Sequence, residues 1–364
     1  MNIIFFAHRI IYGGGEKVRN WLANQLIDHG HTVVYAIPTI DEQVTADLHK
    51  VGLLGRVKAI EYPFHIKKKK PCLYYKRILN IYQEHNIHLL IFFGGSLVEQ
   101  LAARQLGVKI LLSERCDPHS RSIPSQILKQ IQYHVADGYV FQTPEASQCY
   151  GKHAHQIGTV IPNAILDKSP DPIFTNLRKE IVTVGRLSNE KNQLMLLKAF
   201  AIIHNQMPDF KLVFYGSGPL KNTLIKYANA HGIGNKISII SGKTNITELI
   251  NGASLFVLSS NTEGMPNALI EAMSMGILSI STDCPIYGPR FLVSEGKNAF
   301  LTPPNDANLL ADKILFALNH PDADKIRKEA VNIRKRLHPT QIFSQWLSYI
   351  SQITNNKNLS LIHI

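Results

Sequence analysis

Short apolar runs alternate with amphipathic stretches along the whole chain. In the first half, such runs are followed in most cases by the spacing of hydrophobic positions that is typical of a helix. The first of these helices is expected over 16–29 and ends at Gly30. The expected strands of the first half are 3–7, 32–37, 56–60, 89–93, 110–112 and 138–141. Buried strands alternating with helices predict a parallel sheet that is covered on both faces.

The second half repeats the same alternation. Its expected strands are 180–184, 211–215, 237–241, 255–258, 278–281 and 299–301. Its expected helices are 192–205, 219–231, 246–251, 267–275 and 308–318. The pattern therefore predicts an α/β chain with two Rossmann-like doubly wound domains and a cleft between them.

Polar and proline-containing segments mark the expected boundary between the two domains. Pro162-Asn163 and the loop 167–172 lie where the first alternation ends. We predict an N-terminal domain over 1–163 and a C-terminal domain over 164–338. The stretch 339–364 is expected to form a helix that crosses back to the N-terminal domain, followed by a tail.

Composition agrees with two folded domains in a reducing compartment. The 364 residues are 45% hydrophobic and 18% charged, which excludes a disordered or fibrous chain. The four cysteines form no C-x-x-C pair, so neither a zinc site nor a disulfide framework is indicated. Scattered cysteines, and the absence of any long apolar run, favour the cytoplasm.

The chain is basic, with a formal net charge of +12. Such a charge attracts the phosphates of nucleotides, nucleic acids or lipid headgroups. The cations are spread evenly over both halves, which speaks against a nucleic-acid-binding arm. The one run, 67–70 (KKKK), is either a solvated loop or a peripheral contact with anionic membrane lipid or a lipid-linked diphosphate acceptor.

Two carboxylates flank the start of the helix expected after the strand 255–258. Glu263 lies in the loop and Glu271 about one turn inside the helix. Between them, Gly264 permits a close turn, and the helix start offers free amide groups that suit a phosphate. Glu271 is placed to accept hydrogen bonds from vicinal hydroxyls such as those of a ribose. A capped helix with acidic residues near its start is the alternative, and spacing alone does not decide between them.

Two cations follow the strand 180–184. Arg186 comes just after Gly185, and Lys191 precedes the next helix. Loops at the carboxyl ends of parallel strands face the ligand crevice, and an Arg fork with a Lys point charge matches a diphosphate. Two solvated surface cations are the alternative interpretation.

These stretches, in this order, resemble the retaining glycosyltransferases of family 4, which have the GT-B fold. Glu263 and Glu271 match the E-x7-E motif of that family, and 184–187 (VGRL) with Lys191-Asn192 matches a second signature. Further matches are the turn 215–219 (YGSGP) and Ile161-Pro162-Asn163. The residues 283–285 and 288–290 resemble a subgroup that serves cell-surface polysaccharide assembly. The resemblance covers the second half and is thinner in the first.

The resemblance implies a role for each matching position. Arg186 and Lys191 would bind the donor diphosphate and, with Glu263 near the transferred sugar, form the catalytic set. Glu271 would hold the ribose. The remaining donor-binding positions implied by the resemblance are Gly14, Gly15, Gly216, Gly264, Met265, Pro266, Asn267 and Ala268. Fixed cations and amides would stabilise the leaving diphosphate without a metal or other cofactor.

The acceptor side departs from the family pattern. Many members carry a histidine just after a first-domain strand, and here that neighbourhood reads 112–119 (LSERCDPH). Either His119 is displaced from the usual position, or Glu114 and Arg115 serve instead. These three are the candidate acceptor or sugar contacts.

The sequence and the resemblance together predict a retaining transferase. Its donor would be a nucleotide diphosphate sugar, with UDP favoured, carrying a hexose or N-acetylhexosamine. Its acceptor would be a growing, lipid-linked surface glycan of a capsule, lipopolysaccharide or exopolysaccharide. Three alternatives remain open: transfer to a sugar phosphate or a protein, a non-catalytic nucleotide-sugar-binding subunit, and a nucleic-acid-binding protein.

Overall fold

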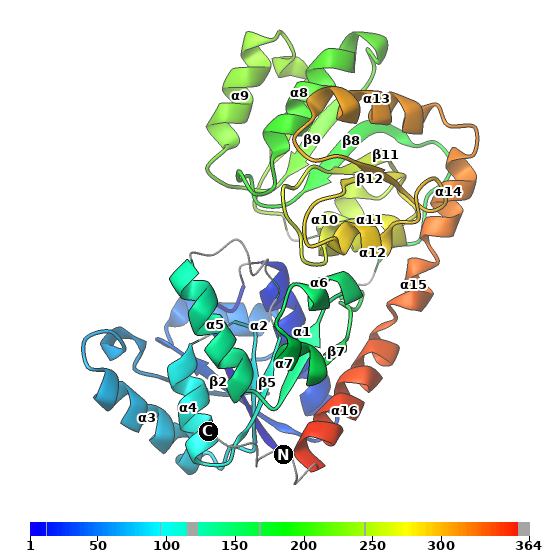
Figure 1. The fold of residues 1–364 in the computed structure, drawn as a ribbon. Coiled ribbons are helices and arrows are strands. Elements are labelled where there is room, and N and C mark those ends of the chain that lie inside the picture. Colours follow the sequence, from blue (N-terminus) through cyan, green and yellow to red (C-terminus); the bar gives the residue numbers. More distant parts are fainter. Residues whose placement is uncertain are drawn as a thin grey trace. The chain divides into compact units, whose positions relative to one another are not determined.

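The computed structural model describes residues 1–11, 13–94, 96–113, 115, 123–166, 169–243 and 245–355. The chain divides into two compact units (Figure 1). Unit 1 comprises Met1–Leu166 with Pro339–Ile364, and unit 2 comprises Asp167–His338. Each unit is built on a parallel sheet with helices on both faces.

Within the described residues, unit 1 holds a seven-stranded parallel sheet in the order β3-β2-β1-β4-β5-β6-β7. Its strands are β1 (Asn2–Phe6), β2 (Thr32–Ile37), β3 (Lys58–Glu61), β4 (Leu89–Phe92), β5 (Lys109–Leu112), β6 (Gly138–Phe141) and β7 (Gly158–Val160). Its helices are α1 (Gly14–Asp28), α2 (Glu42–Lys50), α3 (Pro71–Glu84), α4 (Leu97–Gln105), α5 (Ile123–Val135), α6 (Pro144–Gln148), α7 (Lys152–Gln156) and α16 (Pro339–Asn355), with a short 3-10 turn η1 (Phe64–Ile66).

Alternate residues of each strand of unit 1 pack on opposite faces of its sheet. Ile4 and Phe6 of β1 lie in one core with side chains of α3, α4 and α5. On the other face, Phe5 contacts Phe93, and Phe93 stacks on Trp346 of α16 with ring centroids 6.3 Å apart. Both faces of the sheet are thus buried, as the continuous apolar runs predict.

The terminal helix α16 belongs to unit 1. The amide of Tyr139 donates a hydrogen bond of 3.0 Å to the hydroxyl of Tyr349. Gly138 makes this contact possible, because a Cβ there would come within 2.2 Å of Ile353. The helix therefore lies directly on β6, at a position where the strand has no side chain.

Unit 2 repeats the architecture with a six-stranded parallel sheet among its described residues, in the order β10-β9-β8-β11-β12-β13. Its strands are β8 (Arg178–Val184), β9 (Lys211–Tyr215), β10 (Ile237–Ile240), β11 (Ala253–Leu258), β12 (Ser279–Thr282) and β13 (Phe300–Thr302). Its helices are α8 (Gln193–Ile203), α9 (Lys221–Ala230), α10 (Ile246–Ile250), α11 (Asn267–Ser274), α12 (Gly288–Leu292), α13 (Ala307–Leu318), α14 (Ala323–Ala330) and α15 (Ile333–Arg336). Helices α8, α9 and α13 share one core, and α11 packs on β11 and β12.

The expected strands all exist, with ends that differ by a few residues at most. The short elements β7, α6, α7, α12, α14 and α15 are absent from the prediction. The strand β7 begins at Gly158, where a Cβ would meet the ring of Phe141 at 2.3 Å. A glycine-led run of three residues carries no periodicity, so only the packed sheet identifies it as a strand.

Candidate active site

Each of the two sheets has a point at which the order of its strands reverses. In unit 2, β8 lies between β9 and β11, so the chain leaves β8 on one side and returns on the other. In unit 1, β1 lies in the same way between β2 and β4. Ligands of open α/β sheets bind outside the carboxyl ends of the strands at such a reversal of strand order. The loops after β8 and β11, and those after β1 and β4, are therefore the places to search.

In unit 2, an ion pair joins the two loops at the reversal point. The Nζ of Lys191, from the loop after β8, lies 2.7 Å from Oε1 of Glu263, from the loop after β11. The hydroxyl of Ser260 donates to the same oxygen at 2.6 Å. Glu263 is 9% exposed, so this carboxylate is held almost entirely by protein groups. The structure thus brings together two residues that lie 72 positions apart in the sequence.

The neighbours of Lys191 stabilise its positive charge. Burial disfavours the charged amine, but Glu263 and then Glu190 outweigh burial, and the pKa of Lys191 is raised above its ordinary value. The amine is therefore protonated at neutral pH and available as a fixed cation. Its side chain is 21% exposed, so it also remains within reach of a ligand.

Arg186 lies in the same loop and is more exposed. Its side chain is 48% exposed, and its guanidinium lies 3.5 Å from the carboxylate of Glu190. The carbonyl oxygen of Arg186 accepts a bond of 2.8 Å from the side chain of Gln193, which fixes the backbone at this point. Arg186 and Lys191 share Glu190 as a neighbour, since Nζ of Lys191 lies 3.6 Å from it. Both cations that the sequence singles out therefore lie in one loop around one acidic side chain.

Glycines allow the loops of unit 2 to touch backbone to backbone. A Cβ on Gly216 would come within 1.9 Å of the carbonyl oxygen of Gly185, and one on Gly218 within 2.3 Å of that of Leu187. The amide of Leu187 also donates to the carbonyl of Ser217 at 2.9 Å. Gly216 thus supports the loop that carries Arg186. This packing is a structural reason for the glycine, beside the donor contact that the resemblance implies.

The loop before α11 is built in the same manner. A Cβ on Gly288, at the start of α12, would come within 1.5 Å of the carbonyl oxygen of Gly264. Met265 and Pro266 are buried, whereas Asn267 and Ala268 are partly exposed. Among the described residues no side chain caps α11, because Pro266 occupies the N-cap position. The N-terminus of α11 follows the loop at the carboxyl end of β11, and a helix N-terminus in such a position suits a phosphate.

Glu271 lies within α11, and its side chain is 6% exposed. It follows Glu263 along the same loop and helix start. The described structure thus places all the unit 2 positions of the predicted donor site around the ends of β8, β9 and β11.

In unit 1, the glycine loop after β1 begins α1. Gly13 is the N-cap of α1 without a capping side chain among the described residues, and Gly14 and Gly15 form the first turn. A Cβ on Gly15 would meet no atom within 4 Å. Among the described residues, therefore, nothing in the packing requires a glycine at position 15.

A polar cluster beside this loop has no counterpart in the prediction. Glu99, in the first turn of α4, is 2% exposed and pairs with Nζ of Lys67 at 2.9 Å. Its carboxylate also accepts from the hydroxyls of Tyr74 and Ser96. The two loops of the reversal point, after β1 and after β4, both reach this cluster.

His8, directly after β1, completes the cluster. The hydroxyl of Tyr62 lies 3.1 Å from Nδ1 of His8, and the ring of Phe64 lies edge-on at 4.5 Å between centroids. Burial, followed by the cation Lys67, lowers the pKa of His8 below its ordinary value. His8 is therefore a neutral hydrogen-bonding group at pH 7, partly open to solvent. The sequence offers no signal for this cluster except that His8 directly follows the first strand.

The candidate acceptor residues of the sequence are only partly described. Glu114 and His119 lie outside the described residues. Arg115 stacks over Phe93 at 4.9 Å and Trp346 at 5.9 Å, and donates to the side chain of Asn163. Burial lowers the pKa of Arg115 to about 9. These contacts tie α16 to the end of β5, so they favour an architectural role for Arg115 over direct contact with a sugar.

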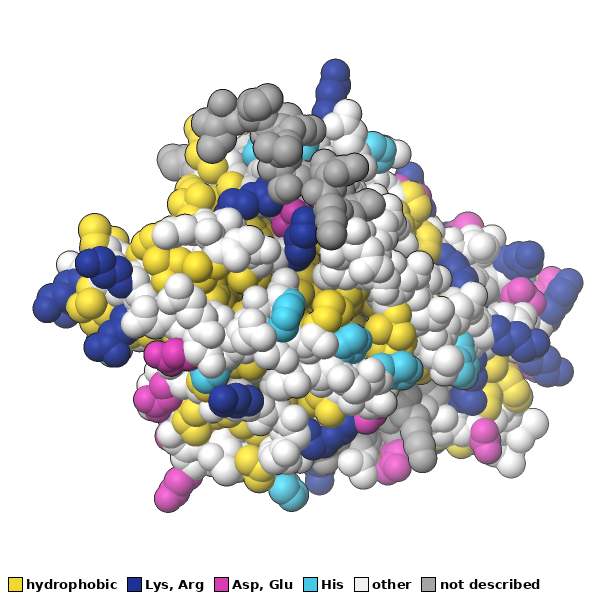
Figure 2. Space-filling view, turned by 90° about the horizontal axis from the view of Figure 1, so that it is seen from below, with side chains coloured by type: hydrophobic (Ala, Val, Ile, Leu, Met, Phe, Trp, Pro, Cys, Tyr) yellow, Lys and Arg dark blue, Asp and Glu magenta, His cyan; other side chains and the backbone are white. Residues whose placement is uncertain are grey.

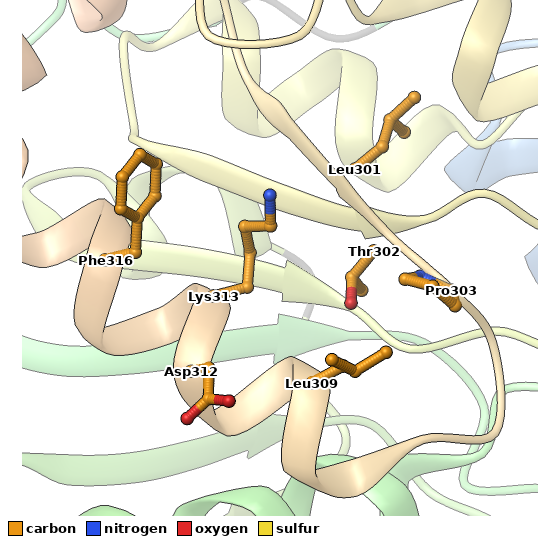
Figure 3. A pocket seen from close by; sticks show the side chains of 7 residues that line it. All are labelled: Leu301, Thr302, Pro303, Leu309, Asp312, Lys313 and Phe316. Carbon is orange, nitrogen blue, oxygen red and sulfur yellow. The ribbon is translucent and has the colours of Figure 1, made fainter.

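Among the described residues, no other pocket, metal-binding cluster or membrane-spanning helix gives an alternative diphosphate site. A pocket of about 310 Å³ lies between β13 and α13, and Figure 3 shows its lining, with Lys313 beside Leu309 and Phe316. Its single cation, Lys313, is paired with Glu295 at 3.0 Å, so the pocket lacks the charge that a diphosphate needs. The described residues hold no cluster of His, Cys, Asp and Glu that could bind a metal. None of their helices is long and apolar enough to cross a membrane.

Comparison with known proteins finds a family match within unit 2. Residues 168–336 match the family model of glycosyl transferases group 1. An uncharacterised glycosyltransferase of Haemophilus influenzae is 25% identical over 85% of this chain and 88% of its own length. One of Methanocaldococcus jannaschii is 26% identical over 59% of this chain and 63% of its own length. The match therefore spans less than two thirds of the latter protein.

A relative with a named reaction matches about half of the chain. It is the Campylobacter jejuni α-1,4-N-acetyl-D-galactosaminyltransferase acting on a diphospho-undecaprenol-linked GalNAc-GalNAc-diNAcBac acceptor, 29% identical over 48% of each chain. Among solved structures, Anabaena HepE in complex with UDP and glucose has a TM-score of 0.81 at 17% identity, covering 97% of this chain and 100% of the other.

These findings establish the fold and the proteins that the chain resembles. The two Rossmann-like domains have the GT-B fold, and residues 168–336 of unit 2 are similar to the glycosyl transferases group 1 model. Along 85% of its length the chain is similar to an uncharacterised glycosyltransferase, and similarity to a relative with a named reaction is limited to about half of it.

Proposed function

We propose that the chain is a retaining glycosyltransferase that uses a nucleotide diphosphate sugar, with UDP as the favoured nucleotide. The observation that carries the proposal is the Lys191–Glu263 pair, which joins the loops at the reversal of strand order in unit 2 beside the exposed cation Arg186. The group 1 match covers this region, and a structural neighbour was solved with UDP and glucose.

In the proposed reaction, the bond between the anomeric carbon and the diphosphate oxygen breaks, and its electron pair stays on the diphosphate. Arg186 and Lys191 supply two positive charges to that leaving group, and the first amides of α11 supply dipoles. The acceptor hydroxyl oxygen bonds to the anomeric carbon, and its proton passes to the departing phosphate oxygen. Front-face attack of this kind accounts for retention without an enzymic nucleophile.

Glu263 has a positioning role in this proposal as well as its place near the sugar. Because Glu263 is nearly buried and fixed by Ser260, it holds the amine of Lys191 at one point. A cation that is fixed before the donor binds does not need to reorganise as charge develops on the diphosphate. Glu271 is assigned to the ribose hydroxyls.

The acceptor belongs to unit 1 in this proposal. The His8 cluster offers a neutral histidine, a buried carboxylate with its cation, and the exposed ring of Phe64. Hydrogen-bonding groups beside an aromatic ring suit the polar edge and the apolar face of a sugar. We assign to this cluster the binding of a growing lipid-linked glycan, by analogy with the Campylobacter relative.

The test is a transfer assay with the full chain. Purified protein is incubated with UDP-glucose, UDP-galactose, UDP-N-acetylglucosamine, UDP-N-acetylgalactosamine or GDP-mannose, together with bacterial glycolipid extract. We expect nucleotide release with one donor that depends on the extract, and an α-linked product by proton NMR. If no donor releases its nucleotide, the enzymatic assignment is overturned. A β-linked product would overturn the retaining mechanism.

A further inference from the structure

The loop after β8 has exposed side chains but a fixed backbone. We call residues 186–192 the cation loop. Asn189 and Glu190 in it are exposed, yet their carbonyl oxygens accept hydrogen bonds of 2.9 and 2.8 Å from the loop after β11. The next carbonyl, that of Lys191, accepts one of 3.0 Å from the hydroxyl of Ser259. Carbonyl groups at the surface can bond to water instead, so three successive protein donors fix this loop more closely than solvation requires.

One residue, Asn261, supplies most of these bonds. Its backbone amide donates to the carbonyl of Glu190, and its side-chain amide donates to that of Asn189. Its side-chain oxygen accepts a bond of 2.9 Å from the side chain of Asn192. The backbone N–H, the Nδ2 and the Oδ1 of Asn261 are therefore all bonded to the cation loop.

Asn192 extends this network to a third loop. Its backbone is left-handed, with φ 46° and ψ 42°, a conformation that asparagine adopts more readily than most residues. Besides its bond to Asn261, its side-chain amide donates to the side chain of Asn305, in the loop after β13, at 3.1 Å. Lys191 directly precedes Asn192, so the cation is attached to a residue that two other loops hold.

A fixed position distinguishes Lys191 from the other cations of this basic chain. Figure 2 shows Lys and Arg side chains at several separate places on one face of the molecule. Lys179, for example, is 59% exposed and pairs with Asp209, which is 69% exposed. Exposed pairs of this kind hold neither partner in one geometry. In Lys191, by contrast, both the carbonyl and the amine are bonded to the loop after β11.

We propose that Asn261 is a positioning residue for Lys191 in the transfer reaction, an inference that rests on the proposed function. Asn261 acts through the cation loop, by keeping Nζ of Lys191 at the 2.7 Å contact with Oε1 of Glu263. Asn261 and Glu263 belong to the same loop, which therefore fixes Lys191 through its backbone and through its amine. A cation that is held in place before the donor binds stabilises developing charge without reorganisation.

The experiment is a double-mutant cycle in the full chain. It compares the parent, Asn261→Ala, Lys191→Met and the combination of both changes. Asn261→Ala removes the two side-chain hydrogen bonds and keeps the backbone one. If Lys191→Met is unfolded, Lys191→Met/Glu263→Gln replaces it as the background, because it leaves no buried carboxylate without its cation. Each protein is measured for affinity to UDP, GDP and ADP, for kcat and KM of transfer, and for unfolding in urea.

Asn298→Ala is the matched control. Asn298 is partly buried, as Asn261 is, and its side chain also donates and accepts, to the carbonyl of Leu292 at 3.1 Å and from the amide of Ser294 at 2.7 Å. It precedes β13 and so lies at the amino end of that strand, away from the cation loop. The control therefore measures the loss of a comparable carboxamide without a change at the donor site.

We expect Asn261→Ala to lower kcat by about 10–100-fold, and Asn298→Ala to retain the kcat of the parent. In the Lys191→Met background, Asn261→Ala should change kcat by less than about twofold, because the group through which it acts is gone. A residue that only stabilises unit 2 would lower kcat by the same factor in both backgrounds. That result, or a parent-like kcat for Asn261→Ala, would overturn the inference.

The cycle separates failure of this inference from failure of the proposed function. If no nucleotide binds the parent, or if Lys191→Met binds and turns over as the parent does, the donor site is wrong and the role of Asn261 is overturned with it. If Lys191→Met is impaired and Asn261→Ala is not, only the role of Asn261 is overturned.

Discussion

The reversal points of the two sheets occupy the same place in the topology but are built in different ways. In unit 2, short linear stretches supply the chemistry: Arg186 and Lys191 follow β8, and Glu263 follows β11. In unit 1, the cluster takes His8, Lys67 and Glu99 from three separate segments. In the proposed function, the two loops of unit 2 hold the constant diphosphate of the donor, and the scattered positions of unit 1 hold the variable acceptor.

The two sites also differ in charge. The reversal point of unit 2 presents two cations, of which Arg186 is the more exposed, while in the His8 cluster Lys67 is neutralised by Glu99 and the histidine is neutral. This difference matches the proposed function, in which unit 2 binds an anion and unit 1 binds a neutral, hydroxyl-rich molecule. The following predictions test this contrast.

The largest effect is expected at the fixed cation. Lys191→Met removes a charge from the developing diphosphate and should lower kcat by about 10²–10³-fold. It also leaves Glu263 nearly buried without its cation, so stability must be measured alongside. The double variant Lys191→Met/Glu263→Gln should regain stability in urea unfolding but not activity. The control Lys198→Met changes an exposed lysine of α8 and should behave as the parent. Recovery of activity in the double variant would contradict the role of Lys191.

The second largest effect is expected at two glycines, one closely packed against backbone and one with no atom near its Cβ position. Gly288→Ala places a Cβ within 1.5 Å of the carbonyl of Gly264, so the loop before α11 must shift. We expect a loss of about 1–3 kcal/mol in the free energy of unfolding, together with weaker nucleotide binding. Gly15→Ala meets no atom within 4 Å and should fold normally, yet raise KM for the donor sugar. Thermal unfolding and donor kinetics measure both, and an unchanged KM for Gly15→Ala would remove that glycine from the site.

Ion pairs of the two units should differ in their contribution to stability. Lys67→Met deprives the buried Glu99 of a charge-assisted hydrogen bond and should lower the free energy of unfolding by about 1.5–3 kcal/mol. Glu190→Gln breaks an exposed contact with Arg186 and should change it by less than about 1 kcal/mol. Denaturant unfolding provides both values. Equal losses would show that Glu99 is better solvated than its 2% exposure indicates.

The smallest effect is expected in the pKa of His8. The pKa of His8 lies below the ordinary histidine value of about 6.5, through burial and through Lys67. His8 therefore stays neutral above that value and gains its proton only as the pH falls, which opposes folding in acid. Lys67→Met removes the nearby cation and should raise the pKa of His8, measured from its ring proton by NMR. A pKa that stays constant or falls would contradict the geometry of the cluster.

The sequence predicts unit 2 better than unit 1 for a physical reason. The cations Arg186 and Lys191 and the carboxylate Glu263 lie in the loops that follow apolar strands, so the ends of those strands locate them from the sequence alone. Glu99 carries no such signal, because a glutamate in the first turn of an amphipathic helix is normally exposed. Only the packing of α3 against α4 shows that it is buried between Tyr74 and Lys67.

Helix α5 shows what the spacing of hydrophobic residues does not predict. The spacing of its apolar residues alone would place Ile127, Leu128 and Ile131 against the sheet. The structure instead places Tyr133 there, packed on the rings of Tyr139 and Tyr150. The aromatic ring fills that volume, and the aliphatic stripe faces outward. A hydrophobic pattern gives the two faces of a helix but does not identify which of them is buried when both contain large side chains.

The most direct test of the donor site is a calorimetric titration of the parent and two variants with UDP, GDP and ADP. Arg186→Ala removes an exposed cation paired with Glu190, and Lys179→Ala removes an exposed cation paired with Asp209, so both are surface changes of the same kind. We predict that one nucleotide, UDP, binds the parent, that Arg186→Ala weakens it by about 10–100-fold, and that Lys179→Ala leaves it unchanged. Equal affinity in all three proteins, or no binding to any nucleotide, would contradict the donor site proposed for unit 2.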